Sequence, residues 1–320
     1  MHCLRLSLPA GRTRRHRRTL LAGALLAGLF ASGQPSPLSA QSSAAERASS
    51  AGSERRVVLI TGSTDGLGRE VARRLAATGA HVIVHGRNQE RGAALVAEIA
   101  RAGTGSAAFY AADLASLDEV RTFANALLRD YERIDVLVNN AGIWLNRSTE
   151  RSLSEDGHEL HFAVNYLSGY LLTRLLLPRI LSTPGARIIN VASAAQAPID
   201  FADIMLARGY SGSRAYAQSK LAQVMFTFDL AQELANEAVT VAALHPATLM
   251  DTPMVREAGA RPRSTIAEGA DAVIHLVLSP GIESGQYHNG REPARAHAQA
   301  YDSEARRRLR ALSVDLTAAP

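Results

Sequence analysis

From Arg56 onward, short apolar runs alternate with segments whose apolar positions recur with helical periodicity. Val57–Thr61 is an apolar run of strand length, which predicts a buried strand. Leu67–Thr78 repeats its apolar positions with the period of a helix, and Gly79 supplies a common helix end. The same reasoning predicts strands at Ala80–His85, Ala107–Ala112, Val136–Asn139, Arg187–Val191 and Val239–Leu244, and helices at Glu90–Ala102, Leu117–Asp130, His161–Leu181 and Arg214–Ala235.

This alternation predicts the fold class. Strands and helices that alternate along a chain form right-handed βαβ units, whose parallel strands share one sheet covered by helices on both faces. We find no repeat of solenoid period and no internal linker within residues 56–320. The sequence therefore predicts a single, doubly wound α/β domain over residues 56–320.

Residues 1–40 differ in composition from the rest of the chain. They contain six arginines and no acidic residue, and the apolar run Leu20–Phe30 has 11 residues. A bilayer span needs about 20 residues, so we expect no stable membrane span. A basic segment before a short apolar run is typical of a signal peptide, and Arg17-Arg18 resembles a twin-arginine signal.

We therefore expect residues 1–40 to be a twin-arginine-like signal peptide that exports the protein to the periplasm. Leu38-Ser39-Ala40 offers a cleavage site, and residues 41–55, rich in Ser and Ala, form a linker. Two alternatives stay open. The leader could be a mis-assigned start, which would leave the protein in the cytoplasm, or an uncleaved anchor.

The formal net charge of +5 comes from this leader, and the remaining chain has a net charge of −1. A nucleic-acid partner would need basic residues clustered on the folded body; we find no such cluster and expect no such partner. The only cysteine, Cys3, lies in the leader, which excludes a disulfide or thiol nucleophile in the body. His158 and His161 lack the spacing of a metalloprotease helix, so no metal site is predicted.

A glycine-rich segment joins the first expected strand to the first expected helix. Glycines there allow a tight turn and a close approach of backbone to a pyrophosphate, and the following helix N-terminus attracts anions. A purely structural glycine-rich turn is the alternative. The candidate cofactor contacts are Gly62, Ser63, Thr64, Asp65, Gly66, Leu67 and Gly68.

The end of the second expected strand bears on the choice of cofactor. An enzyme that selects NAD places a carboxylate there for the ribose 2′-hydroxyl, whereas Arg87 and Asn88 occupy this region. Arg87 could pair with a 2′-phosphate, so the sequence favours NADP(H) over NAD(H). An ordinary solvated arginine is the alternative interpretation of Arg87.

Tyr216 and Lys220 are four residues apart on an expected helix and so share one face. Lys220 is the only lysine in the chain. A free tyrosine has a pKa of about 10, and a nearby ammonium lowers that pKa by favouring the phenolate. We therefore expect Lys220 to lower the pKa of Tyr216, which could then exchange a proton with a substrate oxygen near neutral pH.

Two further polar residues are candidates for the same site. Ser193 follows an expected strand, where sites of parallel sheets form, and its hydroxyl could bind the substrate oxygen. Asn165 lies in an otherwise apolar stretch, and a buried asparagine needs partners. Taken alone, Ser193 could be an ordinary loop serine, and Asn165 could be a satisfied structural amide.

Together, these residues make the chain resemble the short-chain dehydrogenases/reductases, over about residues 56–317. The resemblance implies a Rossmann-like domain with a mostly parallel, seven-stranded sheet and helices on both faces. Within the family, the retinol dehydrogenase and WW-domain oxidoreductase branch is most similar. The motifs are Thr61–Gly68, His85–Asn88, Asp113–Leu117, Asn139–Gly142, Asn165, Ser193, Tyr216-x-x-x-Lys220 and Ser219–Ala222.

The resemblance also implies roles for these residues. Tyr216 would be the general acid/base, Ser193 would orient the substrate oxygen, and Lys220 would hold the nicotinamide ribose. Asn165 would anchor a water that links Lys220 to solvent. Asp113 and Leu114 would contact the adenine, while Asn140, Ala141, Gly142 and Pro246 would line the cofactor channel.

The function expected is hydride transfer between NADP(H) and a small apolar alcohol or carbonyl, such as a retinoid, a steroid or another apolar aldehyde or ketone. The apolar segment Ala247–Arg263 suits such a substrate. A non-catalytic, NADP-binding regulatory or scaffold protein of the same fold is the alternative. The apolar helix Tyr166–Leu177 has few polar positions, which favours its burial against a second subunit. The resemblance also implies a homodimer or homotetramer that forms through this helix and the Tyr216 helix.

Overall fold

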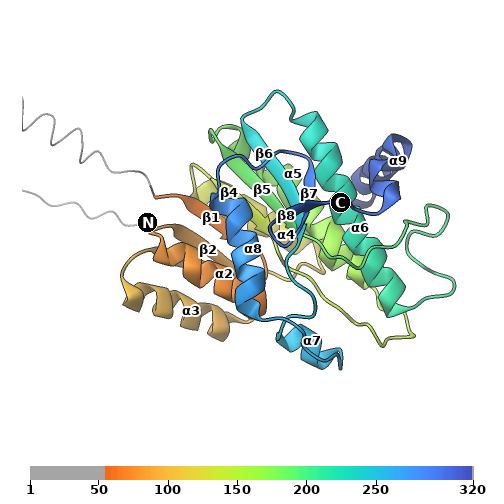
Figure 1. The fold of residues 1–320 in the computed structure, drawn as a ribbon, viewed down its shortest axis with the longest axis horizontal. Helices are drawn as coiled ribbons and strands as arrows, with labels where there is room; N and C mark the ends of the chain where they lie inside the picture. Colours follow the sequence, from red (N-terminus) through yellow and green to blue (C-terminus); the bar gives the residue numbers. More distant parts are fainter. Residues whose placement is uncertain (1–54, 319–320) are drawn as a thin grey trace, which may run out of the picture. The chain divides into compact units, whose positions relative to one another are not determined.

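In the computed structural model, which describes residues 55–318, the strands form one eight-stranded sheet in the order β3-β2-β1-β4-β5-β6-β7-β8 (Figure 1). Neighbouring strands are parallel except for β7 and β8. Strand order reverses between β1 and β4, and ligands of such sheets bind beside this point, at the carboxyl ends of the strands. The strands are β1 Val57–Ile60, β2 His81–Gly86, β3 Ser106–Ala111, β4 Val136–Asn139, β5 Ala186–Val191, β6 Val239–His245, β7 Gln286–Asn289 and β8 Glu292–Ala294.

Helices cover both faces of the sheet (Figure 1). Successive side chains of a strand point to opposite faces of the sheet, so both faces carry apolar residues that need to be covered. In β1, Leu59 packs into one hydrophobic core, whereas Val58 and Ile60 pack into the other. The core around Leu59 includes α4 Leu117–Asp130, α5 Ser168–Leu181, α6 Gly212–Glu233 and α9 Ser303–Thr317. The opposite core includes α2 Gly66–Ala77, α3 Gln89–Ala102 and α8 Ile266–Leu278.

The doubly wound α/β fold is confirmed, but the sheet has eight strands rather than seven. The additional strand, β8, is three residues long and returns antiparallel to β7 after Gly290, whose φ is 63°. Pro293 lacks a backbone N–H, which suits this edge position. Neither β7 nor β8 contains an apolar run, so periodicity gave no signal for either strand.

The helix expected over His161–Leu181 consists of two parts. A π-helix, η1 Phe162–Leu167, opens it, and α5 continues to Leu181 with Pro178 inside its last turns. Single π-helical turns occur within α-helices, often at functional sites. The wider turn of η1 contains Asn165, one of the residues expected at the site.

The apolar segment Tyr166–Leu177 is covered by the chain's own fold. Tyr166, Leu172 and Leu176 are at most 2% exposed, and the Tyr166 hydroxyl lies 2.6 Å from Ser313 Oγ on α9. The apolar composition of this segment is therefore explained without a second subunit. The homodimer or homotetramer stays a prediction.

The expected signal peptide, residues 1–40, and nearly all of the expected linker lie outside the described residues. Within residues 55–318, no helix is both long enough and apolar enough to cross a membrane. Export to the periplasm and its cytoplasmic alternative both stay predictions.

Candidate active site

The glycine-rich turn after β1 packs against the segment after β4. Thr61 Oγ1 accepts the backbone N–H groups of Asn140 and Ala141, each at 3.0 Å. The Asn140 amide donates to the carbonyl oxygens of Thr61 and Gly62, at 2.8 and 3.0 Å. These bonds join the two loops on either side of the point where strand order reverses.

Two glycines permit this close approach. A Cβ on Gly68 would lie 2.3 Å from the Gly62 carbonyl oxygen, and one on Gly62 would lie 2.8 Å from the Ala141 Cα. Gly62 and Gly66 also have positive φ values, 62° and 50°, which favour glycine. The turn therefore needs its glycines for its own packing. The glycines also place no side chain between the backbone at the N-terminus of α2 and a ligand.

The side chains of the turn differ in where they point. Asp65 caps α2, where its carboxylate accepts the Gly66 N–H at 2.7 Å. Ser63 is fully buried and donates to the Ile60 carbonyl, and Leu67 packs into the core beneath α2. Ser63 and Leu67 could thus meet a cofactor only through their backbone. Thr64 lies over Gly86, where an added Cβ would be 2.6 Å from Thr64 Oγ1.

His85 belongs to this turn, although no role was predicted for it. Its Nδ1 accepts the Gly62 N–H at 3.0 Å, so the proton of the neutral ring lies on Nε2. Burial lowers the pKa of His85 to about 4, which keeps the ring neutral at physiological pH. Its position at the end of the second expected strand, beside the turn, was the available signal.

The end of β2 carries exposed arginines. Arg87, with 70% of its side chain exposed, lies 3.5 Å from Asp113, which follows β3. Arg91, in the first turn of α3, lies 2.6 Å from Asp65 and was not predicted. Asn88 caps α3 by accepting the Arg91 N–H. Leu114 is buried in the core, with only 5% exposed.

Ser193 and Tyr216 are brought together from two elements. Ser193 lies just beyond β5, and its carbonyl accepts from Tyr287 of β7 at 3.1 Å and from Gln196 at 2.9 Å. Tyr216 lies in the second turn of α6, which Ser211 caps. Burial raises the pKa of Tyr216, and the neighbouring Ser193 side chain has a smaller, lowering effect.

Lys220 lies one turn after Tyr216, with its Nζ 5.7 Å from the centre of the tyrosine ring. Nζ donates to the Val191 carbonyl and to Gln223 Oε1, both at 2.9 Å. Burial lowers the pKa of Lys220 to about 7. Burial thus disfavours the Lys220 ammonium as well as the Tyr216 phenolate. The expectation that Lys220 lowers the pKa of Tyr216 stays a prediction.

Asn165 binds the segment after β4. Its Oδ1 accepts the Ile143 N–H at 2.7 Å, and its Nδ2 donates to the Ile143 carbonyl and to Ser219 Oγ. A Cβ on Gly142 would lie 3.2 Å from Asn165 Oδ1 and 3.5 Å from Lys220 Nζ. Asn165 thus lies near Lys220, as expected, with its amide bound to protein. Its expected link to a water stays a prediction.

The loop after β6 begins at the buried Pro246 and extends over the glycine-rich turn. A Cβ on Gly66 would lie 3.4 Å from Thr252 of this loop. Leu249 has a φ of 50°, which is unusual for a residue with a side chain. The loop is tied back on itself, since Leu249 accepts the Arg263 N–H at 2.9 Å.

The site thus combines a glycine-rich turn at a helix N-terminus with an adjacent Ser–Tyr pair and a buried lysine. Comparison with known proteins agrees with this combination, because the family model for short chain dehydrogenases matches residues 56–263. The chain belongs to the short chain dehydrogenase family. It is accordingly an oxidoreductase that acts on CH–OH groups, of the retinol dehydrogenase branch.

Named relatives in this branch cover most of the chain. Human retinol dehydrogenase 11 is 33% identical over 278 residues, which cover 83% of this chain and 86% of the relative. Mouse polyprenol dehydrogenase is 37% identical over 290 residues, which cover 82% of this chain and 84% of the relative.

Solved structures share the fold. A protein from Mycobacterium paratuberculosis is 31% identical with a TM-score of 0.69, and the match covers 82% of this chain and 94% of that one. A short chain dehydrogenase from Shigella flexneri, solved in complex with NADP, is 24% identical with a TM-score of 0.61. That match covers 73% of this chain and 96% of the other.

Proposed function

We propose that this oxidoreductase uses NADP(H) and interconverts a lipophilic alcohol with its aldehyde or ketone. The observation that carries the proposal is the placement of the Ser193 side chain beside Tyr216, with Lys220 one turn further along α6. A hydroxyl pair of this kind can bind one carbonyl oxygen and also deliver a proton to it.

The turn between β1 and α2 fits a dinucleotide. Its backbone is bare at Gly62 and Gly66, and the first turn of α2 has N–H groups without helical acceptors, which suit a pyrophosphate. Asn140 and Ala141 pack against the same turn, and Gly142 follows them. When bound, the nicotinamide ring supplies the hydride that reduces the carbonyl carbon or accepts it from the alcohol.

Arg87 supports the choice of NADP(H). Its exposed guanidinium stands at the end of β2, where dinucleotide folds bind the adenosine ribose, and Asp113 is the acid beside it. A guanidinium binds phosphate through charge-assisted hydrogen bonds. The NADP complex of the Shigella flexneri structure agrees with this choice.

The chain's own residues account for the proton. In reduction, Tyr216 donates its hydroxyl proton to the substrate oxygen while Ser193 donates a hydrogen bond to the same atom. Lys220, with a pKa of about 7, can hold or release a proton near neutral pH and can thereby help to restore the Tyr216 proton. In oxidation, the same proton moves from the alcohol to Tyr216.

The substrate is proposed to be apolar. Trp144 packs against the Tyr216 ring with centroids 5.7 Å apart, and the loop after β6 contains the half-buried Leu249. The relatives named retinol dehydrogenase and polyprenol dehydrogenase support a lipophilic alcohol. The direction of the reaction in the cell depends on the cofactor ratio rather than on these residues.

The test is oxidation of NADPH, with NADH in parallel, by the purified protein with apolar aldehydes and ketones that include retinal. Turnover with NADPH that Tyr216→Phe abolishes would support the proposal. Tight NADPH binding without turnover on any substrate would favour the non-catalytic regulatory protein. Failure to bind either cofactor would contradict both functions.

A further inference from the structure

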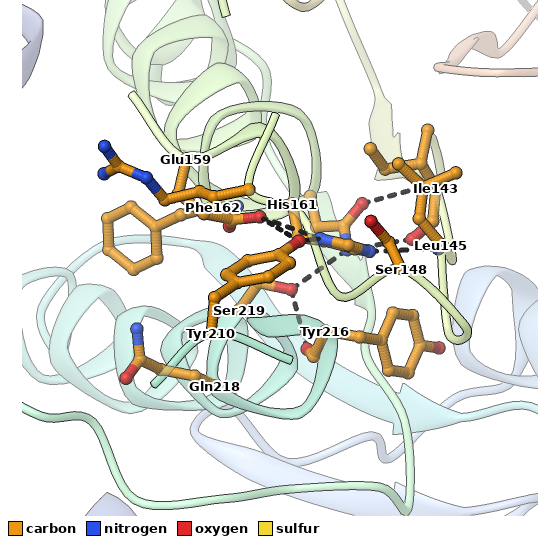
Figure 2. A network of polar contacts seen from close by, with 12 residues as sticks. Ile143, Leu145, Ser148, Glu159, His161, Phe162, Tyr210, Tyr216, Gln218 and Ser219 are labelled. Atoms are coloured by element: carbon orange, nitrogen blue, oxygen red, sulfur yellow. Dashed lines mark hydrogen bonds and ion pairs between the residues drawn. The ribbon is translucent and has the colours of Figure 1, made fainter. Parts of the chain in front are cut away.

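Two buried, ionisable side chains lie beside Tyr216 without belonging to the expected catalytic set. Glu159 is 1% exposed and His161 is fully buried, and the rings of His161 and Tyr216 are nearly perpendicular with centroids 6.4 Å apart. Figure 2 shows that both side chains belong to a network of polar contacts that reaches Leu145 and Tyr210. A buried carboxylate is costly without partners, so its partners indicate what it does.

The hydrogen bonds of His161 determine its tautomer. Its Nε2 lies 3.0 Å from the backbone nitrogen of Leu145, which can only donate, so Nε2 is the acceptor. Its Nδ1 lies 2.9 Å from Glu159 Oε1 and carries the proton. His161 is therefore a neutral ring that accepts at one nitrogen and donates at the other (Figure 2).

Glu159 holds His161 in this tautomer. Its Oε1 also accepts from the Tyr210 hydroxyl at 3.2 Å, and its Oε2 accepts the Phe162 N–H at 2.8 Å. Three donors thus satisfy one carboxylate, and they come from two separate segments of the chain. Such a carboxylate fixes the orientation and the tautomer of the His161 ring, so that the lone pair on Nε2 can accept the Leu145 N–H.

The segment that His161 binds contains Trp144. Ile143 is bound through its N–H and its carbonyl by Asn165, and Leu145 is bound through its N–H by His161. His161 and Asn165 are four residues apart, one immediately before η1 and the other within it. The backbone is therefore fixed on both sides of Trp144, whose indole packs against the ring of Tyr216.

We propose that His161, oriented by Glu159, is a positioning residue that holds Trp144 against Tyr216 and thereby shapes the wall of the substrate pocket. The wall is a flat aromatic surface beside the proton donor. It favours carbonyl compounds with a flat ring attached to the carbonyl carbon over compounds with a puckered ring at that position. This inference about selectivity rests on the proposed oxidoreductase function, whereas the placement of Trp144 does not.

The chain provides a direct probe, because Trp144 is its only tryptophan. Its fluorescence in the protein without cofactor can be quenched with acrylamide, which reports how well the indole is held and covered. The variants are His161→Leu, which removes the acceptor for Leu145, and Glu159→Gln, which can reverse the His161 tautomer. His161→Gln is the conservative variant, since its amide oxygen can accept the same N–H.

We expect His161→Leu and Glu159→Gln to raise the quenching constant at least about twofold by loosening this segment. His161→Gln should stay close to the parent protein. His158→Gln is the matched control, because His158 lies in the same segment but contacts the Leu316 carbonyl instead. Circular dichroism identifies the variants that fold. If His161→Leu does not fold, Glu159→Gln serves as the test.

The second measurement compares benzaldehyde with cyclohexanecarboxaldehyde, which have rings of similar size that are flat and puckered, respectively. The ratio of their kcat/KM values should change about tenfold in His161→Leu and Glu159→Gln and be restored in His161→Gln. Folded His161→Leu and Glu159→Gln with parental quenching would overturn the proposal. If the parent protein turns over neither these aldehydes nor the apolar aldehydes and ketones of the first test, the proposed function is at fault, and quenching still decides the role of His161.

Discussion

Lys220 donates from its Nζ to the carbonyl oxygen of Val191, the last residue of β5, at 2.9 Å. The contact places an amine at the carboxyl end of a central strand, next to the site at Ser193. Only 4% of Lys220 is exposed, and burial lowers its pKa from 10.5 to about 7. A neutral amine can still make this hydrogen bond, so the contact does not require the charge.

This low pKa predicts how stability depends on pH. Between pH 7 and 10.5, the unfolded chain holds a proton on Lys220 that the folded protein has released, so its contribution to stability rises with pH. The slope from this group is at most about 1.4 kcal/mol per pH unit. We expect the Lys220→Met variant to lose this pH-dependent contribution. Urea unfolding of the parent protein and the variant from pH 6.5 to 10 measures it.

Comparison of the two proteins at each pH cancels the titration of other groups. The loss of hydrogen bonds to Val191 and Gln223 adds a cost that hardly changes with pH. The free-energy difference between parent and variant should therefore depend on pH in this range. Parallel curves would mean that Lys220 is protonated to the same extent in the folded and unfolded states.

Removal of the Tyr216 hydroxyl should affect catalysis rather than the fold. Tyr216→Phe keeps the ring that packs against Trp144 but loses the proton donor, and we expect kcat to fall by about 10²- to 10⁴-fold. NADPH binding, measured by nicotinamide fluorescence, should change little. Tyr110→Phe is the control, because it removes a hydroxyl that is bound to Asp130 of α4 instead of to Ser193, Tyr216 or Lys220. Equal losses in both variants would contradict the role of Tyr216.

Much of the fold followed from local sequence. The strand Val136–Asn139 was predicted with the observed bounds, because buried parallel strands are short apolar runs. Helix α8 was missed although Thr265 and Glu268 form a capping box, a signal that sequence inspection can find. The π-helix around Asn165 had no such signal, because its neighbours give no local indication of a wider turn.

The site was predictable where one residue type is chemically required, as with Tyr216 and Lys220. The hydrogen bonds that hold the surrounding loops in place were not predictable. His85 and Gly62 are 23 positions apart, and His161 and Leu145 are 16 apart, so both hydrogen bonds exist only once the chain has folded. The shift in the Lys220 pKa likewise comes from burial, which spacing along the helix does not reveal.

Arg87 should discriminate between the two nicotinamide cofactors. Loss of a charge-assisted hydrogen bond to phosphate costs about 1.5–3 kcal/mol, so Arg87→Gln should raise KM for NADPH by about 10- to 100-fold. KM for NADH should hardly change, because NADH has no 2′-phosphate. Arg101→Gln, at the exposed far end of α3, makes the same charge change as a control. An equal rise for both cofactors would contradict the assignment of Arg87 to the phosphate.

Gly68 should tolerate no side chain. An alanine Cβ there would lie 2.3 Å from the Gly62 carbonyl oxygen and 2.5 Å from Asn140 Nδ2, which would push the turn away from the segment after β4. We expect Gly68→Ala to lower the free energy of unfolding by about 1–3 kcal/mol and to weaken cofactor binding. Urea unfolding and NADPH titration measure the two effects.

The matched control is Gly169→Ala in α5, where the nearest atom to an added Cβ is Asn139 Cγ at 3.4 Å. Alanine favours a helix over glycine by up to about 1 kcal/mol, so this variant should be at least as stable as the parent. Both changes add one methyl group to a helix beside the site, and they differ in what the methyl meets. Equal stability of the two variants would show that the turn can move away from Asn140 without cost, and the packing argument for Gly68 would fail.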